Sequence, residues 1–342
     1  MKLPIVITLG DPAGIGPEII AKAFRDAPDT VHGCFVAGDV ATLRCAAATL
    51  QGDSQVSLPV AEIDTPAAAL TAPPRCVPVL QVVPRAEPVA LGQVSAAAGK
   101  MAGDCVFWAA RAALRGEVGA IVTAPLHKEA LSAAGAPYSL YPGHTELLQA
   151  VAAEHLGVPV AELPVRMMLA NDELRTVLVS IHVSLRDAIE SVTASNILQT
   201  LRITHQSVGA ALQKTVRIGV AGLNPHAGEG GLFGREEIEA IAPAIAQARA
   251  EGIDARGPFA PDTVFMRGRG FKEFDVVVAM YHDQGLIPVK YLGVDQGVNV
   301  TLGLPFVRTS PDHGTAFDIA GQGIADPASL LAAVAMARQL SK

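Results

Sequence analysis

Short runs of consecutive apolar residues alternate with longer, alanine-rich segments along this chain. The apolar runs predict seven buried strands, at residues 5–9, 34–38, 120–124, 165–170, 176–181, 216–221 and 275–280. Two alanine-rich stretches, 95–115 and 186–212, predict helices between them. Strands that are apolar throughout are typical of parallel sheets covered on both faces. The alternation therefore predicts an α/β fold with a largely parallel sheet.

Length and composition narrow the class of protein. A chain of 342 residues is larger than one core typically supports, so we expect two domains. Half of the residues are apolar and 17% are charged, which is typical of a globular protein. The net charge of -7 argues against a nucleic-acid partner, because a phosphate backbone needs a basic face. No stretch reaches the ~18 apolar residues of a membrane span, so we expect no membrane partner.

The cysteines indicate the compartment. The chain has four, Cys34, Cys45, Cys76 and Cys105, and no Cys-x-x-Cys pair. This pattern predicts free thiols in a reducing cytoplasm better than a disulfide framework or a cysteine zinc site. We therefore expect a cytoplasmic protein.

A glycine-rich loop joins the first predicted strand to the helix that follows. Its glycines are Gly10, Gly14 and Gly16, so it is not a Gly-x-Gly-x-x-Gly fingerprint. Pro17 suits the first turn of a helix, and Glu18 favours the positive end of the helix. A ligand-binding turn and a turn that only packs are both open interpretations.

Three histidines occur in polar motifs, two of them directly after predicted strands. They are His182, His226 and His282. A single histidine in such a place is more often structural. Three neutral imidazoles that converge on one cleft would suit Zn²⁺ or a similar divalent ion and leave one position open for substrate.

Other polar residues are candidates for binding an anion. His144 and Thr145 lie where a predicted helix begins, so backbone N–H groups there can bind an anion. The alternative interpretation is that Thr145 is an ordinary N-cap. Lys290, Asn299 and Arg308 follow one another in segments rich in glycine and proline, and such side chains bind carboxylates and phosphates. Scattered surface charge is the alternative interpretation.

Two further features complete the set of candidates. Asp262 lies in a predicted turn, where it is either a base or the acceptor of an Asx turn. Segment 310–327 is polar and rich in glycine, with His313, Asp318 and Gly321 among its residues. It is too polar for a core strand, and it can hold a flat, hydroxyl-rich ligand such as the adenosine half of a dinucleotide.

Taken together, these motifs resemble the 4-hydroxythreonine-4-phosphate dehydrogenase family. The resemblance covers nearly the whole chain and rests on Gly-Asp-Pro-Ala-Gly-Ile-Gly-Pro-Glu at 10–18, Thr-Ala-Pro-Leu-His-Lys at 123–128, Gly-His-Thr-Glu at 143–146, Asn-Pro-His-Ala-Gly-Glu at 224–229, Tyr-His-Asp-Gln-Gly at 281–285 and the stretch 297–323. The first and last blocks also resemble isopropylmalate dehydrogenase. This implies two α/β/α domains with an active-site cleft between them. We expect a first domain of 1–125 plus 286–342 with the nucleotide loop, and a second of 126–285 with the metal ligands and dimer contacts.

The resemblance also implies a role for each candidate. The metal ligands would be His182, His226 and His282, one of them from the partner subunit, so that a homodimer shares its active sites. The substrate contacts would be His144, Thr145, Lys290, Asn299 and Arg308. The cofactor contacts would be His313, Gly314, Thr315, Asp318 and Asp326.

The expected activity is metal-dependent, NAD- or NADP-linked oxidation of 4-phosphohydroxy-L-threonine at C3, followed by decarboxylation, in vitamin B6 biosynthesis. The metal would be Zn²⁺, Co²⁺ or Mg²⁺, the base Lys290 or Asp262, and Asp318 favours NAD. Close alternatives are a 4-phospho-D-threonate or 4-phospho-D-erythronate dehydrogenase. A cis-dihydrodiol carboxylate dehydrogenase and a phosphate acyltransferase, which shares the general fold, are more distant ones.

Overall fold

The computed structural model describes residues 3–50, 57–85, 87–293 and 296–341. The chain divides into two compact units: unit 1 is Met1–Leu163 with Leu304–Ser341, and unit 2 is Pro164–Gly303. The sequence predicted the first boundary at 125 and the second at 285, so both differ. The first differs because α4 (Lys128–Ala133) and α5 (His144–Leu156) pack against α3 (Ala96–Leu114) of unit 1. The second differs because α10 (His282–Leu292) and β11 (Val298–Leu302) contact strands of unit 2.

Unit 1 contains a parallel arrangement of strands. Each neighbouring pair in the order β3-β4-β2-β1-β5-β12 runs parallel. The strand order runs outward in opposite directions from β1 and β5, so this pair is the switch point of a doubly wound sheet. The strands are β1 (Ile5–Thr8), β2 (Cys34–Gly38), β3 (Val60–Glu62), β4 (Val77–Gln81), β5 (Ala120–Thr123) and β12 (Val307–Pro311).

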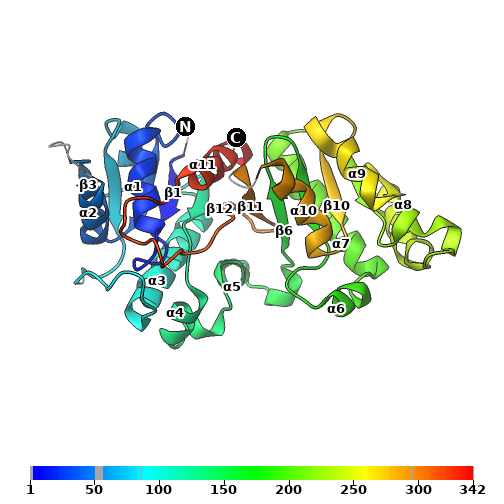
Figure 1. Ribbon diagram of the computed structural model, residues 1–342, viewed down its shortest axis with the longest axis horizontal. Helices are drawn as coiled ribbons and strands as arrows, with labels where there is room; N and C mark the ends of the chain where they lie inside the picture. The colour runs from blue at the N-terminus through cyan, green and yellow to red at the C-terminus, as the bar shows by residue number, and fades with distance from the viewer. Residues whose placement is uncertain (1–2, 51–56, 86, 294–295, 342) are drawn as a thin grey trace. The chain divides into compact units, whose positions relative to one another are not determined.

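Helices cover both faces of these strands (Figure 1). One group consists of α1 (Gly16–Asp26), α2 (Val40–Thr49) and α11 (Ala328–Leu340), in which α1 contacts both other helices. The other group consists of α3, α4 and α5, in which α3 contacts both other helices. A core cluster that includes Phe35, Ile121 and Leu148 fills unit 1.

Unit 2 has a mixed set of strands. Its order is β11-β6-β7-β10-β8-β9, in which β6 runs antiparallel to both of its neighbours and the other pairs are parallel. Phe274 and Leu169 are among the residues of its core. The strands are β6 (Arg166–Ala170), β7 (Arg175–Leu178), β8 (Ile218–Ala221), β9 (Ala255–Phe259), β10 (Val276–Ala279) and β11 (Val298–Leu302).

The helices of unit 2 also lie in groups. Helix α7 packs on α8, whereas α9 contacts β8 and β10, and α10 contacts β6, β7 and β10. Their bounds are α6 (Leu185–Glu190), α7 (Ala194–Leu212), α8 (Ala242–Ala250), α9 (Pro261–Gly268) and α10 (His282–Leu292). Short helical turns occur at Pro66–Thr71, Tyr138–Leu140, Val160–Glu162, Pro225–Gly231, Glu237–Ile241 and Arg269–Phe271.

The structure confirms the predicted α/β class and all seven predicted strands. It also confirms the helix at 95–115, which begins after Ser95, whose hydroxyl accepts a hydrogen bond from the N–H of Ala98. The single helix predicted at 186–212 is wrong, because two helices form there. Thr193 interrupts it: its backbone is extended, and its hydroxyl caps α7 by accepting from the N–H of Asn196.

Two predictions from composition can be compared with the structure. The four cysteines are free thiols, as predicted. Within the described ranges, no helix combines the length and hydropathy needed to cross a membrane.

Candidate active site

The loops that follow β1, β5 and β12 meet at the carboxyl end of the unit 1 strands. The N–H of Asp11 donates to the carbonyl of Pro125 over 2.8 Å, and the N–H of Ile15 donates to the carbonyl of Thr315 over 3.0 Å. Three segments that lie far apart in the sequence are thus joined. Because β1 and β5 form the switch point, this is the edge at which open α/β sheets bind ligands.

The glycines of the first loop allow this approach. Gly10 has a φ of +73°, and a Cβ there would lie 2.5 Å from the carbonyl oxygen of Pro125. A Cβ at Gly14 would lie 2.8 Å from the carbonyl oxygen of Thr315. Both positions therefore need glycine so that backbone segments can touch. Packing alone accounts for these two glycines.

A buried carboxyl and a stacked imidazole lie at the same edge, and the sequence analysis gave neither a role. Asp11 is fully buried, and its Oδ1 accepts from the N–H of Ala13 over 2.9 Å. Burial raises the pKa of Asp11, and the Ala13 bond and the charge of His127 partly offset that rise. The His127 ring stacks on Phe317 at 4.7 Å between centroids. Both side chains belong to motifs that carry the family resemblance.

The predicted anion contacts of unit 1 come together. Arg308 on β12 is buried, and its Nε and Nη2 donate to the Thr123 hydroxyl at the end of β5, over 3.2 and 2.7 Å. His144 and Thr145 are the first two residues of α5, whose N-cap, Gly143, provides no side-chain hydrogen bond. His144 Nε2 is buried and lacks a hydrogen-bond partner among the described residues.

The electrostatics of this group favour an anion. Burial, together with the charges of Arg308 and Lys128, lowers the pKa of His144 to about 3. Burial also lowers the pKa of Arg308 to about 10, against the opposing influence of Glu146. At neutral pH His144 is therefore neutral and Arg308 is charged. A cation beside free helical N–H groups is suited to a phosphate or carboxylate.

Lys128 is a member of this group that the sequence analysis missed. It is the first residue of α4, and a Cβ built on Gly143 would lie 3.8 Å from its Cε. Its positive charge also helps to lower the pKa of His144. The sequence carried a signal, because Lys128 ends one of the family motifs. The spacing to His144 along the chain gives no hint that the two side chains are neighbours.

The predicted cofactor residues have different surroundings. Thr315 is buried, whereas His313, Gly314, Asp318 and Asp326 are exposed. The Asp326 carboxylate accepts from the N–H of Ala328 over 2.9 Å at the start of α11, which is a structural role. The structure does not test whether the Asp318 carboxylate binds a ribose. The assignment of these five residues to the cofactor therefore stays a prediction.

A cavity of about 210 Å³ lies beside this segment in unit 1. Its lining is mostly apolar and comes from the loop after β1, the first turn of α1, α2, residues 88–91 and the loop after β12. The lining residues are Pro12, Gly14, Pro17, Glu18, Thr42, Cys45, Ala46, Thr49, Pro88, Val89, Leu91 and Gly321. An apolar slot with a few polar groups at its edge is typical of a site for a flat ring.

In unit 2, two of the predicted metal ligands are neighbours. The rings of His182 and His282 lie 5.7 Å apart between centroids. Both line a pocket of about 470 Å³, together with Tyr281 and Ile287. His282 Nδ1 lies 2.7 Å from the carboxylate of Asp283. A carboxylate in this position fixes the ring and directs the other nitrogen outward, as in many metal sites.

The third predicted ligand, His226, lies in an unusual turn. Residues 226–230 all have positive φ, and His226, Ala227 and Glu229 have values of 53°, 53° and 42°. Each non-glycine residue in this region costs about 1–2 kcal/mol. His182 also has positive φ, 34°. Such conformations are typical of functional sites.

A buried carboxylate supports this turn. Glu237 is 3% exposed. Its Oε1 accepts from the N–H groups of Leu223 and Asn224 over 2.7 and 2.8 Å, and its Oε2 accepts from Asn224 Nδ2 over 3.0 Å. Among the described residues, no three His, Cys, Asp or Glu side chains are grouped closely enough to hold a metal ion. The three-histidine assignment is thus neither confirmed nor contradicted.

The other predicted residues of unit 2 lie on three elements. Lys290 lies in the last turn of α10 and is half-buried, and Asn299 lies on β11 opposite Leu169. Asp262 is exposed in the first turn of α9. Their predicted roles as base or substrate contacts stay predictions.

Comparison with known proteins decides the family. The sequence model described as pyridoxal phosphate biosynthetic protein PdxA matches residues 30–337. This chain belongs to the PdxA family. The resemblance drawn from the motifs is thereby confirmed.

Relatives within the PdxA family have two names. The chain is 52% identical to 4-hydroxythreonine-4-phosphate dehydrogenase of Beijerinckia indica over 338 aligned residues. The alignment covers 98% of this chain and 95% of the relative. The chain is 44% identical, over 344 residues, to D-threonate 4-phosphate dehydrogenase of Salmonella typhimurium, which covers 98% of each. A solved 4-hydroxythreonine-4-phosphate dehydrogenase of Klebsiella pneumoniae has a TM-score of 0.87 and 40% identity over the whole of both chains. The PdxA relatives thus confirm the predicted class of enzyme, a dehydrogenase.

Proposed function

We propose that the chain oxidises 4-phosphohydroxy-L-threonine at its C3 hydroxyl with NAD or NADP. The product, 2-amino-3-oxo-4-phosphooxybutanoate, is a β-keto acid that loses CO₂ to give 3-amino-2-oxopropyl phosphate, a precursor in vitamin B6 biosynthesis. The observation that carries this proposal is the 52% identity, over nearly the full length of both chains, to a relative named for this activity. Free thiols agree with a cytoplasmic location.

The cationic group of unit 1 would bind an anionic end of the substrate. Arg308 and Lys128 supply positive charge, and the N–H groups that begin α5 supply donors. His144, which is neutral, can donate or accept a hydrogen bond without adding charge. Thr145 adds a hydroxyl. In unit 2, Lys290 and Asn299 would contact the substrate as well.

The metal would be held by imidazoles. His182 and His282 supply two ligands from one chain, and we propose that His226 of a second copy supplies the third, so that the enzyme is a homodimer with shared sites. The carboxylate of Asp283 holds the His282 ring in its ligating orientation. A bound Zn²⁺, Co²⁺ or Mg²⁺ would make the C3 hydroxyl more acidic.

Mixed dimers test the shared site. His226→Ala and His282→Ala homodimers would each be inactive, because every site lacks a ligand. A mixed dimer of the two variants has one site with all three histidines, so activity should return when the two proteins are unfolded and refolded together. If no activity returns although mixed dimers form, the sites are not shared in this way.

The cofactor would lie against unit 1. The cavity between α1, α2 and the loop after β12 has the size and the apolar lining for an adenine ring. The carboxylate of Asp318 is exposed, and it would repel a 2′-phosphate, which favours NAD over NADP. A bound nicotinamide would accept the hydride from C3.

The proton of the C3 hydroxyl needs an acceptor from the chain. Lys290 and Asp262 are the two candidates, and a lysine must be neutral to act as a base. A cationic Lys290 would instead stabilise the enolate that forms when CO₂ leaves. If a Lys290→Met variant still reduces the nicotinamide but no longer releases CO₂, Lys290 stabilises the enolate and is not the base.

A second candidate substrate is D-threonate 4-phosphate, because a relative 44% identical over 98% of both chains carries that name. The two substrates differ in the amino group, which 4-phosphohydroxy-L-threonine has and D-threonate 4-phosphate lacks. The test is the rate of nicotinamide reduction with each substrate in parallel, at saturating NAD and with each metal. We expect a higher kcat/KM with 4-phosphohydroxy-L-threonine, and the reverse order would assign the chain to the second activity.

A further inference from the structure

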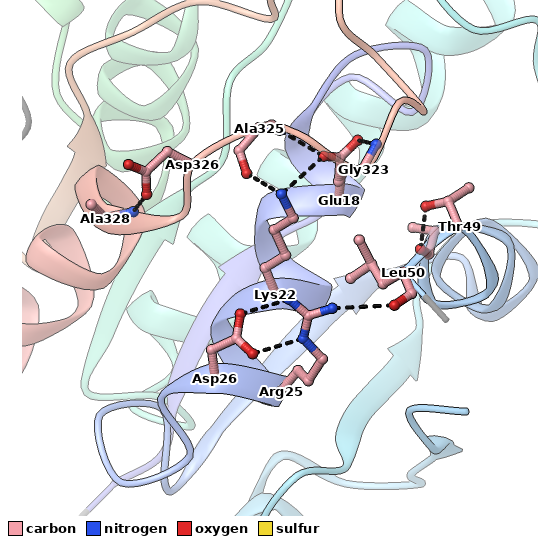
Figure 2. Close-up of polar contacts among 11 residues, drawn as sticks. Glu18, Lys22, Arg25, Asp26, Thr49, Leu50, Gly323, Ala325, Asp326 and Ala328 are labelled. Atoms are coloured by element: carbon pink, nitrogen blue, oxygen red, sulfur yellow. Dashed lines mark hydrogen bonds and ion pairs between the residues drawn. The ribbon is translucent and has the colours of Figure 1, made fainter. Parts of the chain in front are cut away.

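The segment that borders the cofactor cavity is held by two side chains of α1 (Figure 2). Glu18 Oε1 accepts from the N–H of Ala325 over 2.8 Å, and Glu18 Oε2 accepts from the N–H of Gly323 over 3.2 Å. Lys22 Nζ donates to the carbonyl of Ala325 over 2.5 Å. Both backbone groups of Ala325 are thus satisfied by side chains, as a neighbouring strand would satisfy them.

The pair is buried and charged. Glu18 is 2% exposed and Lys22 is 8% exposed, and their charged atoms lie 3.4 Å apart. A buried ion pair adds little net stability, because the cost of removing both charges from water offsets their attraction. It is tolerated when further hydrogen bonds satisfy the charged groups. Here those hydrogen bonds all end on residues 323–325.

The same carboxylate borders the cavity. Glu18 and Gly321 both line it, so Glu18 borders the cavity and also binds the segment that forms one of its walls. Gly321 has a φ of +76°, and a Cβ there would lie 2.3 Å from Leu91 Cδ1, so this wall is closely packed. The position of the wall therefore depends on what holds residues 323–325.

We propose that Glu18 and Lys22 are positioning residues for the dinucleotide. They fix the loop after β12 in the conformation that shapes the cavity for the adenine end of the cofactor. They do so through the backbone of Gly323 and Ala325, and they touch neither substrate nor reacting atoms. This inference rests on the proposed function, because it assigns the cavity to the cofactor.

Three single variants test the pair. Glu18→Gln keeps the shape but replaces one acceptor oxygen by an NH₂ group that faces a backbone donor. Lys22→Met keeps the bulk and removes the donor to Ala325. Asp26→Asn is the matched control, since Asp26 lies on the same helix and pairs with Arg25 at the surface, away from the segment (Figure 2).

Direct binding and steady-state kinetics are the readouts. Calorimetry would give the Kd of each protein for NAD⁺ and for ADP-ribose, and kinetics would give KM for the nucleotide and for the phosphorylated substrate. We expect Glu18→Gln and Lys22→Met to weaken both nucleotides about ten-fold or more, with the substrate KM unchanged. The Asp26→Asn control should stay within about two-fold of wild type.

Three results would overturn the inference. Unchanged nucleotide affinity in both variants would show that the loop does not need the pair. An equal loss of nucleotide and substrate affinity in both, with a lower melting temperature, would show a role in stability alone. Failure of the wild-type protein to bind NAD⁺, NADP⁺ or ADP-ribose would refute the assignment of the cavity, and with it the cofactor of the proposed function. Because that last result concerns the wild type, it is distinct from a failure of the pair alone.

Discussion

Replacement of Glu237 by glutamine should loosen the turn that carries His226. The carboxylate is 3% exposed and accepts three hydrogen bonds from Leu223 and Asn224. The glutamine oxygen can keep the two bonds from backbone N–H groups, but its NH₂ group then faces Asn224 Nδ2, which is also a donor. One hydrogen bond to a charged group is lost, at about 1.5–3 kcal/mol, and the other two lose the benefit of the charge.

The expected sum is a fall of about 3 kcal/mol in the free energy of unfolding. This is comparable to the strain of three non-glycine residues with positive φ, at about 1–2 kcal/mol each. The turn would then no longer be held in one conformation. If His226 is a metal ligand, the affinity for Zn²⁺ or Co²⁺ should fall about ten- to a hundred-fold, as when other supporting groups of metal sites are removed.

Urea unfolding and metal titration by calorimetry measure the two effects. The control is Glu239→Gln, the same chemical change two residues further on, at a side chain that is 62% exposed and pairs with Arg235. That variant should lose no more than about 0.5 kcal/mol. A Glu237→Gln protein with the stability of the control would refute the account of the turn. If Glu237→Gln loses the predicted stability but its metal affinity is unchanged, His226 is not a metal ligand.

Three further variants test other parts of the account. Arg308→Lys keeps a charge but not the planar guanidinium, and steady-state kinetics should show kcat/KM lower by about ten- to a hundred-fold; an unchanged value contradicts its role. Burial would raise the pKa of Asp275, but hydrogen bonds from Arg217 and a lysine outweigh it and hold that pKa well below the usual range. The stability that Asp275 contributes is therefore present above the ordinary aspartate pKa and is lost as pH falls. In urea unfolding, Asp275→Asn should lower the free energy of unfolding by about 3 kcal/mol at pH 7 and by less at acid pH. An equal loss at every pH contradicts this. Asp283→Asn should weaken metal binding in calorimetry about ten-fold by freeing the His282 ring, and unchanged affinity would show that Asp283 does not orient the ligand.

The sequence predicted the buried strands well because parallel strands in an α/β fold are apolar throughout. It missed β3, β4, β9, β11 and β12, of which β4, β9 and β12 contain proline. Arg308 on β12 shows why: its side chain is buried, but Thr123 on a neighbouring strand satisfies it. Whether a polar residue can lie in a sheet depends on partners that only the folded chain brings near.

The candidate site divides in the same way. Side chains within a recognised motif, such as His144 and His282, could be named from the sequence. The contacts that hold those motifs in place could not be predicted. Glu18 was recognised within the first motif, but it binds a segment about 300 residues away, and Glu237 supports a turn with positive φ that no local preference predicts. Lys128 also lies within a motif, but only the folded chain shows that its charge lies near the start of α5.

The central claim is tested most directly by counting products from one reaction. Purified enzyme, 4-phosphohydroxy-L-threonine, NAD⁺ and Zn²⁺, Co²⁺ or Mg²⁺ would be incubated while reduced nicotinamide and CO₂ are measured together. The account predicts equal amounts of both, none of either in the presence of a chelator, and recovery when metal is returned. Full nicotinamide reduction after removal of the metal, or no reduction with any of the three metals and either NAD⁺ or NADP⁺, would contradict it.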